Sequence, residues 1–186
     1  MNAVDLILDR LASVPGGSPR ILGIDGPAGS GKSTLAAAVS AATGAPVVGI
    51  DDFVGWTDLD PAGATWWPRL EAEVIAPFVA GEALSYHRRD WYGDAEGIGV
   101  LDDPIVVGAP GPLLVLEGVS VTRRAIADRL ALRVWVEASR DVCLERGLAR
   151  DGEEMRDHWL VWQELESAFF AVDGARERAD LVLPTA

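Results

Sequence analysis

The clearest candidate for a functional site is the segment from Gly26 to Ser33. It reads Gly-Pro-Ala-Gly-Ser-Gly-Lys-Ser and fits the Walker A pattern G-x-x-x-x-G-K-[ST] at every fixed position. The apolar run 20–25 predicts a strand before this segment, and the alanine-rich run 33–42 predicts a helix after it. In that setting backbone N–H groups converge on phosphate oxygens, and the helix dipole adds its positive end. The pattern predicts binding of ATP with Mg²⁺; the alternative is a glycine-rich turn without a ligand.

The roles within this segment follow from its side chains. Lys32 is expected to reach the β- and γ-phosphates, and Ser33 is expected to ligate Mg²⁺. Lys32 is also the only lysine of the chain, which indicates a site that needs a compact point charge rather than the planar fork of arginine. The residues expected to bind the nucleotide are Gly26, Ala28, Gly29, Ser30, Gly31, Lys32, Ser33 and Thr34.

Four segments stand in a characteristic order along the chain. They are the Walker A segment 24–34, the triplets 51–53 (Asp-Asp-Phe) and 116–118 (Leu-Glu-Gly), and the stretch 144–151. As an ordered set they resemble the uridine kinase family of P-loop kinases, whose superfamily includes phosphoribulokinase and one type of pantothenate kinase. The resemblance covers most of the chain from Arg20 to Pro184. It implies a kinase that transfers the γ-phosphate of ATP to a hydroxyl of a small molecule, with a pyrimidine nucleoside as first choice.

Three acids are expected at the carboxyl ends of strands, where ligands bind in open α/β sheets. Asp51 and Asp52 follow the second strand, and Glu117 ends the third. Phosphoryl transfer needs a carboxylate that orients the hydroxyl and accepts its proton, and the resemblance implies that Asp51 is this base. Asp52 could contact the acceptor, serve as the base instead, or cap the next segment. Glu117 resembles the family's acidic Mg²⁺ ligand and would join Ser33, unless these acids are only solvated strand ends.

Two arginines of the predicted helix 140–150 are further catalytic candidates. Arg146 and Arg150 are four residues apart and share a helix face. In the related kinases this region is a lid, so the resemblance implies a lid over 140–156 whose arginines approach the triphosphate. Positive charge there would stabilise the charge that develops on the transferred group. Alternatively, these arginines pair on a solvated face with Glu145, Glu153 and Glu154.

The segment 84–111 is rich in Gly, Asp and Pro, which predicts an irregular excursion or hairpin on the substrate side. Tyr86 matches a tyrosine of the related kinases, so Tyr86, Arg88 and Trp91 are candidate acceptor contacts together with Asp51 and Asp52. The residues after Tyr86 depart from the family pattern, which leaves the acceptor open. Aromatic rings could stack a base, arginines could bind a charged acceptor, and the segment could equally be a packed hairpin. The same ambiguity applies to Trp56, Trp66 and Trp67.

Short apolar runs alternate with helical patterns, which indicates a parallel sheet covered on both faces. We expect one domain, residues 1–186, with a three-layer α/β P-loop NTPase fold and a mainly parallel five-stranded sheet. Strands are expected at 20–25, 46–51, 113–117, 132–136 and 179–183. Helices are expected at 4–12, 33–42, 66–78, 140–150 and 155–171.

Composition restricts the partners. A formal charge of -13, from 16 basic and 29 acidic residues, argues against nucleic acid but not against a small phosphorylated ligand. No run approaches the ~20 apolar residues of a membrane span, and the N-terminus lacks the pattern of a secretory signal. We therefore expect a cytoplasmic protein with a small-molecule substrate and no membrane partner, while a homo-oligomer is possible. The single cysteine, Cys143, excludes an internal disulfide and is expected to be a core thiol.

Other classes of P-loop protein compete with a nucleoside kinase. A kinase for another small alcohol, such as a vitamin precursor or a sugar phosphate, fits the same motifs. A GTPase switch is excluded in its Asn-Lys-x-Asp form, because Lys32 is the only lysine, and there is no Leu-Ser-Gly-Gly-Gln segment of a transporter ATPase. The size and acidity argue against a helicase. A binding module without turnover stays open.

Overall fold

The computed structural model describes all residues except 1, 18, 56–59, 92–100, 108–110 and 186. Its centre is a five-stranded sheet in the order β2-β5-β1-β6-β7, in which every neighbouring pair is parallel. The strands are β1 (Arg20–Asp25), β2 (Val47–Gly49), β5 (Leu113–Glu117), β6 (Leu132–Glu137) and β7 (Leu181–Pro184). The predicted α/β fold with a parallel five-stranded sheet is confirmed.

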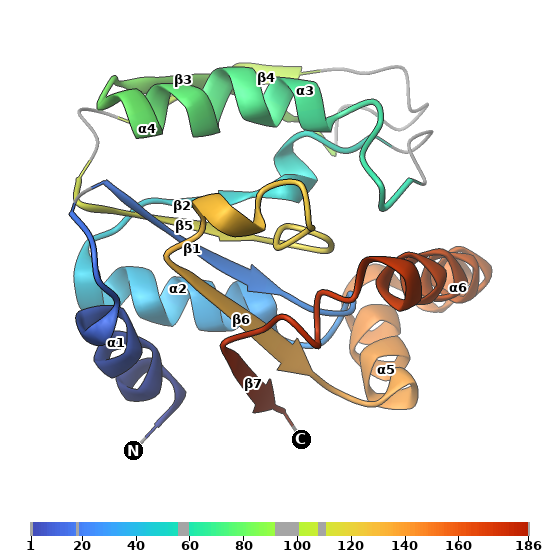
Figure 1. The fold of residues 1–186 in the computed structure, drawn as a ribbon. Helices are drawn as coiled ribbons and strands as arrows, with labels where there is room; N and C mark the ends of the chain where they lie inside the picture. The colour runs from blue at the N-terminus through green and yellow to red at the C-terminus, as the bar shows by residue number, and fades with distance from the viewer. Residues whose placement is uncertain (1, 18, 56–59, 92–100, 108–110, 186) are drawn as a thin grey trace.

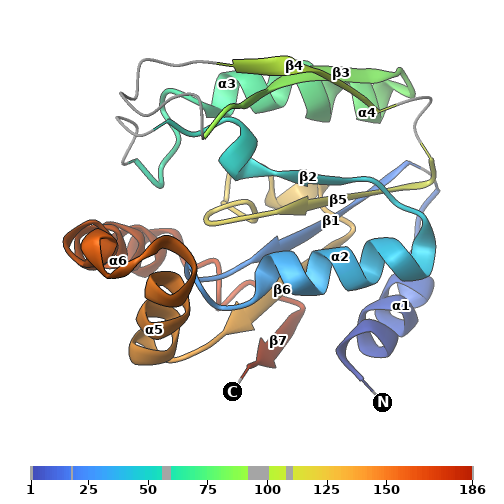
Figure 2. The same cartoon turned by 180° about the vertical axis from the view of Figure 1, so that it is seen from behind.

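Helices cover both faces of this sheet (Figures 1 and 2). On one face, α1 (Ala3–Ser13) and α2 (Lys32–Thr43) pack on apolar side chains such as Leu22 and Val115. On the other face lies a helical segment that runs through α3 (Trp67–Leu70), a π-helical turn (Glu71–Ile75) and α4 (Ala76–Ala80). The alternation of side chains along each strand supplies both cores.

The predicted excursion at 84–111 contains a hairpin. β3 (Leu84–Arg89) pairs antiparallel with β4 (Leu101–Val107) as a separate two-stranded sheet. Figure 1 shows this hairpin beside α3 and α4, away from the main sheet. The hairpin therefore extends the layer that α3 and α4 form over the sheet.

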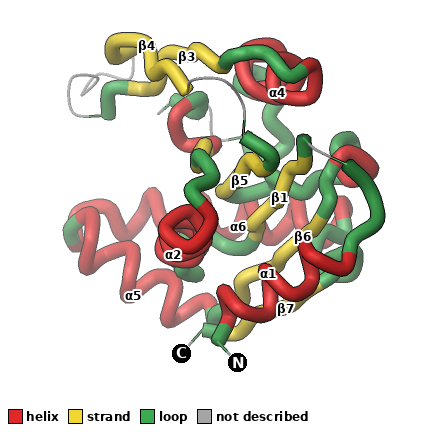
Figure 3. The backbone as a smooth tube through the Cα atoms, turned by 90° about the vertical axis from the view of Figure 1, so that its left-hand side faces the viewer, coloured by secondary structure: helices red, strands yellow, loops and turns green. Residues whose placement is uncertain are grey.

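Two further helices lie beyond the carboxyl ends of the strands. They are α5 (Arg140–Asp151) and α6 (Arg156–Asp173), joined by a 3-10 turn at Glu153–Met155. The arrowheads of β1 and β6 in Figure 1 point toward them, and Figure 3 shows α5 below α2 and α6 behind it. In the part of the chain that the structure describes, no helix is long and apolar enough to cross a membrane.

The strand expected at 46–51 is shorter than predicted. β2 ends at Gly49, and a 3-10 turn (Ile50–Asp52) follows, in which the Phe53 N–H donates to the Ile50 carbonyl at 2.9 Å. Ile50 and Phe53 are both buried in the same core. Side chains three residues apart point to opposite faces of a strand, so burying both in one core requires a turn.

Candidate functional site

The Walker A segment forms a tight turn between β1 and α2. Gly26 has φ 140° and Gly29 has φ 80°, conformations that side chains rarely adopt. A Cβ at Gly26 would lie 2.2 Å from the Val136 carbonyl oxygen, and one at Gly29 would lie 2.4 Å from the Cys143 carbonyl oxygen. The loop therefore packs so closely on the ends of β6 and α5 that only glycine fits at both positions.

Asp25, the last residue of β1, anchors this loop. Its side chain is fully buried, and Oδ1 accepts the Gly26 N–H at 2.7 Å and the Ser120 N–H at 2.8 Å. Oδ2 accepts the N–H and the hydroxyl of Thr122, both at 2.8 Å. Burial raises the pKa of Asp25, and the hydrogen bonds from Thr122 and Gly26 oppose that shift. Asp25 was not among the predicted site residues; the signal available in the sequence was an acid that ends an otherwise apolar strand.

The residues predicted to hold phosphate and Mg²⁺ lie together. Lys32 is 7% exposed, and its Nζ donates to the Pro27 carbonyl at 2.8 Å. The Ser33 hydroxyl lies 3.2 and 3.3 Å from the two carboxylate oxygens of Glu117, although the two residues are 84 positions apart. The loop and the end of β5 thus bring a hydroxyl and a carboxylate to one point beside the only lysine.

This donor set suits Mg²⁺, which prefers oxygen ligands and usually keeps waters and substrate phosphates. Burial raises the pKa of Glu117, and the negative charge of nearby Asp51 raises it further. A cation at Ser33 and Glu117 would relieve that repulsion. Among the described residues, no three His, Cys, Asp or Glu side chains are grouped to hold a metal by themselves. The protein part of a magnesium site would therefore consist of Ser33 and Glu117, completed by phosphate and water.

The 3-10 turn after β2 presents Asp51 and Asp52 toward the hairpin. Asp51 is exposed, and its carbonyl accepts the Trp91 Nε1–H at 3.1 Å. Asp52 is partly buried and accepts the Tyr86 hydroxyl at 2.9 Å. Burial raises the pKa of Asp52, while the Tyr86 hydrogen bond and the charge of Arg88 oppose this shift. The structure therefore brings together all five residues predicted at the acceptor side.

The aromatic residues of this side are largely packed. Tyr86 is 3% exposed, and its ring stacks on Phe53 with centroids 5.0 Å apart. Trp66 is 2% exposed and donates from Nε1 to the Asp60 carbonyl at 3.2 Å. The Tyr86 ring is therefore packed in the core, and its hydroxyl positions the Asp52 carboxylate. Trp56 lies outside the described residues.

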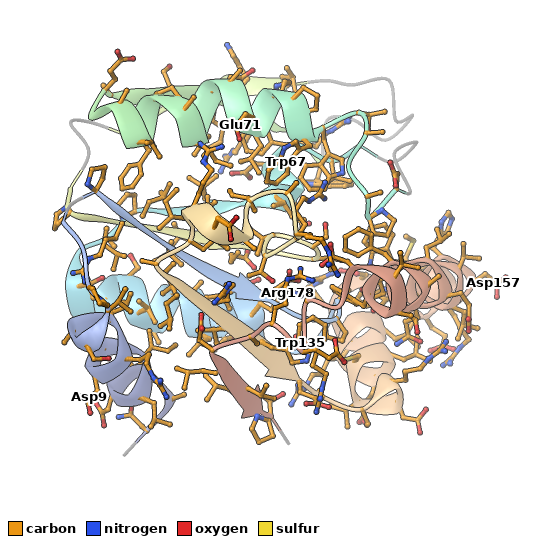
Figure 4. The ribbon with its side chains drawn as sticks, viewed as in Figure 1. Asp9, Trp67, Glu71, Trp135, Asp157 and Arg178 are labelled. Atoms are coloured by element: carbon orange, nitrogen blue, oxygen red, sulfur yellow. The ribbon has the colours of Figure 1, made fainter. Side chains whose placement is uncertain are left out.

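Arg123 lies between two tryptophans of the same side. Its guanidinium carbon is 4.8 Å from the Trp66 ring centroid and 4.4 Å from that of Trp67, which Figure 4 labels beside α3. The guanidinium donates to the carbonyls of Pro61 and Ala62, and burial lowers the pKa of Arg123 to about 10. Trp66 and Trp67 thus contribute to a cation–π stack that fixes the loop before α3.

The two predicted lid arginines differ in position. Arg146 Nη1 lies 3.0 Å from the Thr185 hydroxyl and 3.4 Å from the Gly29 carbonyl, so its charge stands at the phosphate loop. Arg150 is exposed and makes a bidentate ion pair with Asp151, with Nε 2.6 Å from Oδ1 and Nη2 2.8 Å from Oδ2. Of the alternative partners, Glu153 pairs with Arg156, and the exposed Arg150 pairs with a neighbouring acid instead.

One buried acid at the loop was missed by the sequence analysis. Glu166 of α6 is 3% exposed, and its Oε2 accepts the Ala28 N–H at 2.9 Å. The residues of α6 that are buried are Trp159, Gln163 and Glu166, at spacings of four and three. Two polar residues on the buried face of a helix were the signal that could have revealed this contact.

Known proteins resemble this chain in sequence and in fold. The chain is 26% identical to the uridine kinase of Saccharomyces cerevisiae over 192 residues, which covers 92% of this chain and 38% of the yeast protein. A possible uridine kinase from Bacillus stearothermophilus has a TM-score of 0.70 at 18% identity, covering 97% of this chain and 96% of that one. A proposed fructose transport system kinase from a Silicibacter species has a TM-score of 0.66 at 23% identity, covering 99% and 100%. No protein-family model matches the chain.

The parallel sheet and the strand-loop-helix unit with Lys32 and Ser33 define a P-loop α/β protein, and the solved structures share this fold. Together with the yeast relative, they confirm the predicted resemblance: the chain is uridine kinase-like in sequence and in fold. It spans well under half the length of that yeast relative.

Proposed function

We propose that this chain is an ATP-dependent kinase that transfers the γ-phosphate to a hydroxyl of a small molecule. The observation that carries the proposal is the contact between the Ser33 hydroxyl and the Glu117 carboxylate, whose oxygens lie 3.2 Å apart at the end of the Walker A loop. Asp51 stands close enough to act on the ionisation of Glu117. A phosphate loop, a pair of magnesium ligands and a neighbouring carboxylate are the parts that phosphoryl transfer to an alcohol requires.

Each part has a chemical task in this proposal. The loop amides and Lys32 hold the triphosphate, and Lys32 exchanges its present partner, the Pro27 carbonyl, for phosphate oxygens. Ser33 and Glu117 hold Mg²⁺, which when bound neutralises charge on the phosphates. Arg146, already at the Gly29 carbonyl, adds positive charge beside the transferred group. Arg150 would have to leave Asp151 to do the same.

We assign the role of base to Asp51 rather than Asp52. Asp51 is exposed, whereas Asp52 is partly buried and accepts the Tyr86 hydroxyl. A base must reach the proton that it removes. Asp52 then acts on the acceptor side as an oriented carboxylate that Tyr86 holds in place.

For the acceptor we propose a neutral nucleoside, with a pyrimidine nucleoside first. The support is the likeness to a protein named uridine kinase over 92% of this chain. A second candidate, a phosphorylated or carboxylic acceptor, is favoured by Arg88, which is exposed and whose charge acts on Asp52. Such a charge could pair with an anionic group of the acceptor.

The test is a transfer screen with Mg-ATP against uridine, cytidine, pantothenate, sugar phosphates and simple polyols, measured as ADP release and product mass. Lys32→Ala is the control, because it should abolish every signal that comes from this site. Arg88→Ala should raise KM many-fold for a charged acceptor, and Trp91→Ala should do so for a nucleoside. ATP hydrolysis with no phosphorylated acceptor would contradict the kinase proposal.

A further inference from the structure

A carboxylate from the far end of the chain lies on the phosphate loop. Glu166 belongs to α6, yet its Oε2 accepts the N–H of Ala28, 138 residues earlier, at 2.9 Å. The side chain of Trp162, one turn before it on α6, hydrogen bonds to the same carboxyl group. Glu166 is 3% exposed, so it is a built part of the loop and not a surface acid that happens to lie near it.

The charged and titratable groups around Glu166 come from three other elements of the described structure. Lys32 at the start of α2 attracts its negative charge, and Asp25 at the end of β1 repels it. On α5, the charge of Glu166 contributes to a raised pKa of the Cys143 thiol. Arg146 on the same helix donates to the Gly29 carbonyl of the loop. Burial outweighs the favourable contacts and raises the pKa of Glu166 to about 7.

A loop that binds triphosphate should present amides and positive charge, and an ionised carboxylate inside it opposes the ligand. Mg-ATP carries net negative charge, so its arrival would add repulsion to a group that burial already disfavours as an anion. The neutral acid avoids this repulsion, and it still has an oxygen that can accept the Ala28 N–H. Protonation would therefore keep the loop in place and remove the opposing charge.

We propose, on the basis of the proposed nucleotide binding, that Glu166 is a positioning residue of the phosphate loop that binds one proton when the triphosphate binds. Its hydrogen bond to Ala28 orders the loop in both states. Its charge is present only without nucleotide, so affinity for the nucleotide falls as pH rises through the neutral range. This coupling is additional to the phosphate and magnesium contacts of Lys32, Ser33 and Glu117.

The experiment is isothermal titration calorimetry with a non-hydrolysable Mg-ATP analogue from pH 6 to 8.5, in buffers of different ionisation enthalpy. For the wild-type chain we expect proton uptake that approaches one per nucleotide near pH 8, and a loss of affinity that approaches about tenfold per pH unit above pH 7. Glu166→Gln retains a carbonyl oxygen for Ala28 and cannot titrate, so uptake should vanish and affinity should stay level over this range. Glu164→Gln, an exposed change on the same helix, should behave as wild type.

A second variant keeps the test independent of whether Glu166→Gln folds. Trp162→Phe removes a hydrogen bond that favours the ionised form of Glu166, so the pH midpoint of nucleotide affinity should move upward. Nucleotide binding without excess proton uptake over Glu166→Gln, or an unmoved midpoint in Trp162→Phe, overturns the role of Glu166 and leaves the kinase proposal standing. A wild-type chain that binds no nucleotide at any pH overturns both.

Discussion

Replacing Asp25 by asparagine tests whether the carboxylate under the phosphate loop holds the site together. Asp25 accepts four hydrogen bonds of 2.7 to 2.8 Å: two at Oδ1, from Gly26 and Ser120, and two at Oδ2, from Thr122. An asparagine has only one oxygen. If that oxygen serves Gly26 and Ser120, its NH₂ group faces the Thr122 N–H, and one buried donor is left without an acceptor.

The size of the effect follows from these contacts. A buried donor without a partner costs about 1–3 kcal/mol, and hydrogen bonds to a neutral acceptor are weaker by about 1 kcal/mol than those to a charged one. The burial of a negative charge is avoided in the variant, which offsets part of this loss. We expect Asp25→Asn to lower the free energy of unfolding by about 2–4 kcal/mol.

Urea unfolding measures this loss, and titration with Mg-ATP measures whether the loop still binds. Affinity should fall with stability, because Asp25 ties Gly26 to the segment after β5. Asp9→Asn on α1, which changes an exposed acid (Figure 4), should stay within about 0.5 kcal/mol of wild type. An Asp25→Asn chain that unfolds like this control and binds ATP normally would refute the anchoring role.

Four further predictions test other parts of the site. Lys32→Arg should abolish transfer, since the guanidinium is bulkier and its charge more diffuse; near-normal turnover would contradict the need for a compact charge. Asp51→Asn should keep ATP binding and lower kcat by about 10²–10⁴-fold, with a milder loss for Asp52→Asn; the reverse order would move the base to Asp52. Gly29→Ala should cost about 1–3 kcal/mol of stability and weaken ATP binding, because its Cβ would lie 2.4 Å from a carbonyl oxygen; unchanged melting and affinity would contradict that clash. Burial raises the pKa of Glu166 from 4.5 to about 7, so the contribution of this group to the free energy of unfolding should be greatest below pH 4.5 and fall by about 3 kcal/mol as pH rises through 7. Urea unfolding at several pH values measures this loss as the difference between the wild-type chain and Glu166→Gln.

The local parts of the site could be predicted from the sequence, because short-range chemistry determines them. The Walker A spacing fixed the loop between β1 and α2, and the apolar runs at 20–25 and 113–117 match the strands residue for residue. The predicted strand 46–51 was too long, since Ile50 and Phe53 share one core. Periodicity within six residues does not reveal which core a side chain will enter.

The contacts missed by the sequence analysis all join distant segments. Asp25 bonds to residues 95 and 97 positions away, and Glu166 bonds to one 138 positions away. Nothing local distinguishes a buried acid that will find three N–H donors from one that will cap a strand. For Glu166, the polar residues on the inner face of α6 were the available signal, because burial without a partner is costly.

At the predicted acceptor side, the structure weakens the case for stacking on a base. Tyr86 was a candidate to stack on a base, yet its ring packs on Phe53 and its hydroxyl holds Asp52. Of the described aromatic candidates, Trp91 is only partly buried and ties its indole N–H to the Asp51 carbonyl. Among the described residues, an acceptor would therefore meet Asp51 and an Asp52 carboxylate that Tyr86 holds in place, and the buried Tyr86 ring is not available for stacking. Recognition of the acceptor then depends more on hydrogen bonds to its hydroxyls and on the charge of Arg88 than on stacking, which is why the charged acceptors belong in the same screen as the nucleosides.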